Sequence, residues 1–140
     1  MSQKKNIKSI FVNLPVKNIE KTREFWSKLG FSFNEQFSNE KALCLILNDG
    51  NIYSMLISYD LFSTFTNRAI ADGSTSQVLI AIQVDSRERV DEIIKIALEN
   101  GATRYMEPVD EGWMYYDRFV DIDGHQWEVM YGDETLIPKE

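Results

Sequence analysis

Few side chains in this 140-residue sequence could form a reactive centre, and the scarce residue types limit the chemistry most. There is one histidine, His125, so no site can take two imidazole ligands from one chain. There is one cysteine, Cys44, so an intrachain disulfide is excluded. No histidine lies where it could activate that thiol, so we interpret Cys44 as buried and inert. His125 directly follows Asp123-Gly124 and is interpreted as a hairpin residue with a structural or solvent-exposed role.

Glu128 and Arg118 are the charged pair that could act together. Glu128 alternates with Trp127 and Val129, which is the period of a strand with one apolar face. Arg118 lies in an adjacent stretch with the same alternation, so both charges are expected on the face away from the helices. The Arg118 guanidinium could bind an anionic ligand through two hydrogen bonds, or it could neutralise Glu128. Both interpretations stay open.

The first half of the chain predicts the elements that would hold one such face. A helix is predicted from the N-cap Asn18 to Gly30, because apolar residues recur there at helical spacing. Strands are predicted before and after it, near residues 9–17, 31–37, 41–48 and 52–58.

The second half repeats this order. A helix capped by Asp85 or Ser86 is predicted to end at Asn100-Gly101. Strands are predicted around it, near residues 78–85, 103–107, 113–120 and 125–131.

The glycines show that the two halves are an internal repeat of about 70 residues. Gly30 corresponds to Gly101, and Gly50 corresponds to Gly124. The fold class predicted is α+β, with two tandem βαβββ modules. We expect one domain over residues 1–140, with modules at about 8–59 and 77–132 and a connector at about 60–76.

Composition excludes several classes of partner. The chain is 44% hydrophobic and 26% charged, which is typical of a globular domain rather than a disordered one. A net charge of −7 disfavours nucleic acid and anionic membrane surfaces as partners. No apolar stretch has the length of a membrane span, and the N-terminal residues do not resemble a signal peptide. A cytoplasmic location is the expectation.

Two segments carry a resemblance to a known family. The opening FVNLPVKNIEKTREFWSKLGF and the ending FVDIDGHQWEVMY, in a tandem βαβββ chain, resemble the vicinal oxygen chelate superfamily. This superfamily holds the glyoxalase, extradiol dioxygenase, fosfomycin-resistance and bleomycin-resistance proteins. The chain looks most like the small bacterial proteins predicted to be lactoylglutathione lyases. The resemblance implies curled mixed β-sheets around a concave cavity, helices packed outside, and a homodimer.

The metal-ligand positions of the family can be carried onto this sequence. They fall on Phe11 and Leu79 in the first strands of the two modules, and on Ser54 and Glu128 in the last strands. Only Glu128 has the expected ligand atoms, and one carboxylate is too few for zinc, nickel or iron. We therefore expect no metal and no other cofactor.

The function that the resemblance implies is then the binding of a small organic ligand in the concave cavity. Apolar surface would come from Phe11, Leu79, Met114 and Tyr116, and polar groups would be oriented by Asn13, Ser54, Arg118 and Glu128. One alternative is a metal-independent lyase or isomerase that uses Glu128 as acid or base, with Arg118 stabilising negative charge. Others are a glyoxalase-like lyase, if the ligand alignment is shifted, and an interaction module without a ligand. The enzyme question stays open.

Overall fold

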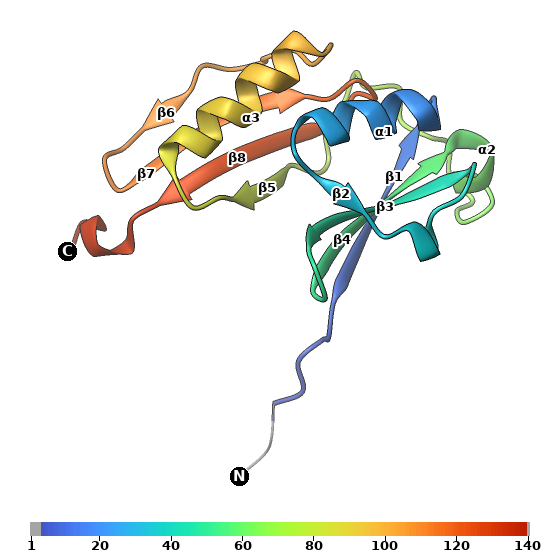
Figure 1. Ribbon diagram of the computed structural model, residues 1–140, viewed down its shortest axis with the longest axis horizontal. Coiled ribbons are helices and arrows are strands. Elements are labelled where there is room, and N and C mark those ends of the chain that lie inside the picture. The colour runs from blue at the N-terminus through green and yellow to red at the C-terminus, as the bar shows by residue number, and fades with distance from the viewer. Residues whose placement is uncertain (1–3, 140) are drawn as a thin grey trace. The chain divides into compact units, whose positions relative to one another are not determined.

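The structure is a computed structural model that describes residues 4–139, and the chain divides into two compact units, residues 1–70 and 71–140. Each unit holds a four-stranded mixed sheet and a helix of ten or more residues (Figure 1). The predicted α+β class with two tandem βαβββ modules is confirmed. No helix within the described range is long and apolar enough to cross a membrane.

Unit 1 contains β1 (Ile10–Val16), α1 (Ile19–Lys28), β2 (Ser32–Phe33), the short 3₁₀ helix η1 (Glu35–Phe37), β3 (Ala42–Asn48), β4 (Ile52–Ser58) and α2 (Tyr59–Phe62). The strand order is β1-β4-β3-β2. β1 runs parallel to β4, and the other pairs are antiparallel. α2 overlaps the start of the connector expected at about 60–76.

The face of the unit 1 sheet that α1 covers can be read from one contact. The Asn18 side chain accepts a hydrogen bond from the Lys21 amide at 3.0 Å and begins α1, as predicted. The Arg23 guanidinium of α1 lies 5.1 Å from the centre of the Phe33 ring. Because Phe33 pairs with Leu45, α1 covers the face to which Leu45 belongs. The other fully buried leucines of that face are Leu43 and Leu56.

Unit 2 contains β5 (Ile80–Gln83), α3 (Arg87–Glu99), β6 (Val109–Asp110), β7 (Met114–Val120), β8 (Gln126–Gly132) and the 3₁₀ helix η2 (Glu134–Leu136). The strand order is β5-β8-β7-β6. β5 runs parallel to β8, so unit 2 has the topology of unit 1.

α3 contacts β7 and β8 and covers one face of the unit 2 sheet (Figure 1). The Tyr115 hydroxyl donates a hydrogen bond to the Asp91 carboxylate of α3, which identifies this face. Phe119, Trp127 and Val129 lie on it and are completely buried. The predicted apolar side of the two last strands is therefore the side that packs under the helix.

The structure decides which residue caps α3, and it corrects the strand predicted near residues 103–107. Ser86 rather than Asp85 caps α3, because its hydroxyl accepts from the Arg89 amide at 3.0 Å. The strand predicted near residues 103–107 is reduced to a single bridge between Thr103 and Val120, and β6 comes later. The pairing of β6 with β7 is shifted by two residues relative to this bridge, and Pro108, which lacks an amide donor, lies in the segment between them.

Candidate functional site

Arg118 and Glu128 face each other across neighbouring strands. They are direct partners in the register of β7 and β8, and their side chains lie on the face opposite α3. The distance from Arg118 Nε to Glu128 Oε2 is 3.7 Å, close enough for an ion pair but too long for a hydrogen bond. The Arg118 side chain is only 9% exposed, whereas that of Glu128 is 26% exposed. The solvent-facing member of the pair is thus the carboxylate.

Tyr116 covers the guanidinium from the same strand. The Arg118 Nη2 atom donates to the Tyr116 hydroxyl at 3.1 Å, and the guanidinium carbon lies 4.9 Å from the ring centre. Such a cation–π contact stabilises a partly desolvated arginine. Met114, two residues earlier on β7, extends this face with an apolar side chain. The structure therefore brings Met114, Tyr116, Arg118 and Glu128 together, as the alternation predicts.

The edge strand β5 leaves Glu128 open on its other side. Ala81 pairs with Glu128 in the parallel register, and its methyl group is too short to cover the carboxylate. Leu79 immediately precedes β5 and is 52% exposed. An exposed leucine near a partly exposed carboxylate supplies both apolar surface and an acceptor.

Polar side chains on the face of the unit 2 sheet that α3 covers form hydrogen bonds with other side chains of the unit. The Arg104 guanidinium donates to both oxygens of Asp117, whose side chain is 3% exposed. Tyr115 donates to Asp91, which raises the pKa of the Tyr115 hydroxyl to about 12. These polar groups form hydrogen bonds with one another, unlike the Glu128 carboxylate, which accepts no hydrogen bond from any residue between 4 and 139.

In unit 1 the corresponding face carries Phe11 and Asn13. Phe11 is 48% exposed and stacks on Tyr53, with ring centres 4.8 Å apart and ring planes 15° apart. Asn13 is exposed on the same face of β1. Both side chains lie on the face opposite α1, as expected, and their role in binding stays a prediction.

Ser54 does not lie on that face, so its proposed contact with a ligand is wrong. It pairs with Val12 and Leu45 on the face covered by α1 and is completely buried. Its hydroxyl donates to the Val12 carbonyl at 2.9 Å. The residue on the opposite face is Met55, which pairs with Asn13 as Glu128 pairs with Ala81.

The four metal-ligand positions of the family can now be tested on chemistry. Phe11 and Leu79 offer no donor atom. The register puts Met55, not Ser54, at the third ligand position, and its thioether is a weak ligand. Only Glu128 is a normal ligand for a divalent cation. No group of three His, Cys, Asp or Glu side chains within residues 4–139 is placed to hold a metal ion. The residues present do not fit the metal centre of the family.

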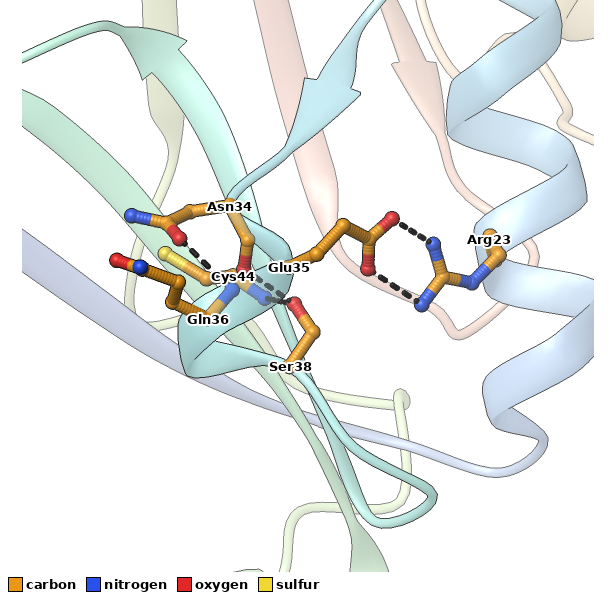
Figure 2. A network of polar contacts seen from close by, with 6 residues as sticks. All are labelled: Arg23, Asn34, Glu35, Gln36, Ser38 and Cys44. Atoms are coloured by element: carbon orange, nitrogen blue, oxygen red, sulfur yellow. Dashed lines mark hydrogen bonds and ion pairs between the residues drawn. The ribbon is translucent and has the colours of Figure 1, made fainter.

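Cys44 pairs with Met55 and is completely buried. Figure 2 shows Cys44 beside Asn34 and Ser38. The Cys44 amide donates to the Ser38 hydroxyl at 3.0 Å, and its carbonyl accepts from the Asn34 amide at 2.9 Å. Burial raises the pKa of the Cys44 thiol. The thiol therefore stays protonated at neutral pH, consistent with the interpretation of an inert residue.

His125 belongs to the turn between β7 and β8, as predicted. Its amide donates to Asp121 Oδ1 at 3.0 Å, and Trp127 Nε1 donates to Asp121 Oδ2 at 2.9 Å. Burial raises the pKa of Asp121, and the neighbouring His125 opposes that shift. The turn is thus organised around the Asp121 carboxylate, with which His125 interacts through its backbone amide and through its charge.

Tyr105 is a site residue that the sequence analysis did not identify. Burial raises the pKa of its hydroxyl, the Glu128 charge raises it further, and the Arg118 charge acts in the opposite direction. Tyr105 therefore lies within electrostatic reach of both members of the ion pair. The alternation from Thr103 to Tyr105 was the available signal, because it places both residues on one face of the expected strand.

The comparisons with known proteins identify the family. The sequence matches the model of the Glyoxalase/Bleomycin resistance protein/Dioxygenase superfamily over residues 8–129. This match spans most of the chain, so the chain belongs to this superfamily, and the resemblance noted in the sequence is confirmed. No curated protein sequence matches that of this chain.

Three solved structures illustrate the shared fold. The hypothetical protein SA1046 from S. aureus is 26% identical, with a TM-score of 0.75 over 91% of this chain and 95% of that one. A bleomycin resistance determinant encoded on the transposon Tn5 is 17% identical, with a TM-score of 0.60 over 90% and 98%. The fosfomycin resistance protein FosX from Listeria monocytogenes is 20% identical, with a TM-score of 0.63 over 99% and 97%.

Proposed function

We propose that this protein binds a small organic ligand on the face of the unit 2 sheet opposite α3. The observation that carries the proposal is the placement of a partly exposed carboxylate, Glu128, beside a buried guanidinium, Arg118, on a face that also carries aromatic and apolar side chains. A few oriented polar groups within apolar surface are typical of small-molecule sites. Tyr116, Met114 and Leu79 supply that surface.

The fold is in keeping with this function. Similar structures include proteins named for resistance to bleomycin and to fosfomycin, which are small organic molecules. Phe11 and Asn13 on unit 1 are proposed as a second contact surface, because both are exposed on the face opposite α1.

We also expect a homodimer, by analogy with the family, and a cytoplasmic location. Light scattering at tens of micromolar protein should give the mass of two chains.

The binding is proposed to be independent of metal. Phe11, Leu79 and Met55 occupy three of the four ligand positions, and none of them is a normal ligand for zinc, nickel, manganese or iron. Elemental analysis of the purified protein should find none of these metals in stoichiometric amount. One metal per chain, removable with loss of ligand binding, would contradict the proposal.

The test of the site is a thermal-shift screen with a library of small organic compounds. Compounds that stabilise the native protein should lose at least part of their effect on Glu128→Gln and Arg118→Met. Ser54→Ala is the matched control. Ser54 is buried on the α1 side of the unit 1 sheet and makes none of the proposed contacts, so its substitution should not alter binding. A library without any stabilising compound, or compounds whose effect survives both site substitutions, would refute the proposed function.

A further inference from the structure

One row of side chains crosses the unit 2 sheet on the face opposite α3. Thr103 and Val120 form a hydrogen-bonded antiparallel pair, with N···O distances of 3.0 and 2.7 Å. Tyr105 lies two residues further along, outside the strands, and both the Glu128 and the Arg118 charges act on its hydroxyl. Arg118 pairs with Glu128 in the register of β7 and β8, so a hydroxyl, a guanidinium and a carboxylate lie within electrostatic reach of one another.

The Tyr105 hydroxyl, Arg118 Nε and the Glu128 carboxylate do not form hydrogen bonds with one another. The Tyr105 hydroxyl and Arg118 Nε are both buried, and neither has a hydrogen-bond partner in the part of the chain that the structure describes. The Glu128 carboxylate approaches Arg118 Nε only to 3.7 Å and accepts no hydrogen bond within the same residues. A buried donor without an acceptor is costly, so such groups call for a physical explanation. Two donors beside one acceptor are complementary to a ligand group that carries both functions.

The charge distribution limits which ligand group fits. Unit 2 has six Lys and Arg residues against sixteen Asp and Glu residues, a formal net charge of −10, whereas unit 1 has nine against six, a net charge of +3. The field of unit 2 opposes an anion, and the Arg118 charge is already opposed by Glu128. A cation would pair with Glu128 but would leave the two donors without an acceptor. A neutral group with a carbonyl oxygen next to an N–H meets all three side chains.

We infer that the ligand carries a carboxamide-type group. Its carbonyl oxygen accepts hydrogen bonds from the Tyr105 hydroxyl and from Arg118 Nε, and its N–H donates to the Glu128 carboxylate. The inference rests on the proposed function and specifies the chemical class of the ligand at the same site. It also assigns Tyr105 as a residue that determines ligand specificity.

The experiment uses benzamide, benzoate and benzylamine as matched probes of the native protein. Binding is followed by the side-chain NMR signal of Arg118 Nε–Hε and by titration. Benzamide should perturb this signal and bind more tightly than the other two. Tyr105→Phe should weaken benzamide binding about fivefold, the effect of losing one hydrogen bond. It should leave the melting temperature unchanged or higher, because it removes an unpaired buried hydroxyl.

Tyr115→Phe is the control on the other face of the same sheet. It removes a hydroxyl that is bonded to Asp91, so it should lower the melting temperature and leave benzamide affinity unchanged. Equal binding of benzoate or benzylamine, or unchanged benzamide affinity in Tyr105→Phe, would overturn the inference while a ligand site at Arg118 remains. A melting temperature that falls in Tyr105→Phe as it does in Tyr115→Phe would also overturn it. Absence of any response to benzamide refutes the inference alone, since the proposed function is judged by the compound library.

Discussion

The ion pair of Arg118 and Glu128 allows the energetics of the site to be predicted from exposure. Unit charges about 4 Å apart attract by about 4 kcal/mol at an effective dielectric constant of about 20. This attraction offsets the cost of removing the charges from water, and that cost falls mainly on Arg118, the more buried partner. Removing one partner therefore lowers the free energy of unfolding by an amount that depends on how deeply the remaining charge is buried.

Glu128→Gln leaves the buried guanidinium without a counter-charge and should lower the free energy of unfolding by about 3 kcal/mol. Arg118→Met leaves a carboxylate that can turn toward water, so the loss should be smaller, about 1.5 kcal/mol. In the double variant neither charge is left unpaired, and the total loss should be about 2 kcal/mol. The coupling energy is then about 2.5 kcal/mol, near the upper end for residues in contact.

Urea unfolding at pH 7 measures all four proteins of this cycle, and constant m-values would confirm a common unfolding reaction. The Arg104–Asp117 pair is the control, because there the carboxylate is the buried partner, at 3% against 36% exposure. Arg104→Met should therefore cost more than Asp117→Asn, the reverse order. Additive losses at Arg118 and Glu128, or the same order of effects in both pairs, would show that exposure does not govern these energies.

Two further predictions concern groups outside the proposed contacts. Asp121→Ala should lower the free energy of unfolding by about 3 kcal/mol, because it removes the side-chain acceptor of the buried Trp127 indole and of two turn amides. Urea unfolding followed by tryptophan fluorescence measures this loss. The bond to Asp91 raises the pKa of Tyr115 to about 12, above its ordinary value of 10, so its contribution to stability is complete below pH 10 and is lost as the pH rises through about 12. Thermal unfolding of Tyr115→Phe should show a flatter pH dependence in that window than the unsubstituted protein.

The site residues of unit 2 could be predicted because their strands are regular. Trp127 and Val129 alternate with Glu128 without interruption, and β7 and β8 pair residue for residue along their whole length. The face of each side chain then follows from the period of two alone. Tyr105 was missed because it lies in an irregular segment, where one bridge at Thr103 replaces a strand.

Ser54 was placed on the wrong face because the two hairpins close differently. In unit 1, Asn48 pairs with Ile52 and the register shifts at a β-bulge, whereas in unit 2 Val120 pairs with Gln126. Counting four residues from the turn glycine therefore reaches opposite faces in the two units. A shift of one residue moves a side chain to the other side of a sheet, and local spacing cannot reveal a bulge.

The corrected register shows how far the two modules have diverged at equivalent positions. Cys44 and Met55 in unit 1 occupy the places that Arg118 and Glu128 occupy in unit 2, since each pair joins the two central strands at the same level of the sheet. The first pair fills its position with sulfur-containing, weakly polar side chains, one of which is completely buried. The second retains charge and unpaired hydrogen-bonding groups at the same level. An unpaired buried polar group lowers stability wherever it occurs, and within residues 4–139 such side-chain groups lie in unit 2. This argues that the Arg118 and Glu128 level of unit 2, and not the Cys44 and Met55 level of unit 1, supplies polar contacts to the proposed ligand.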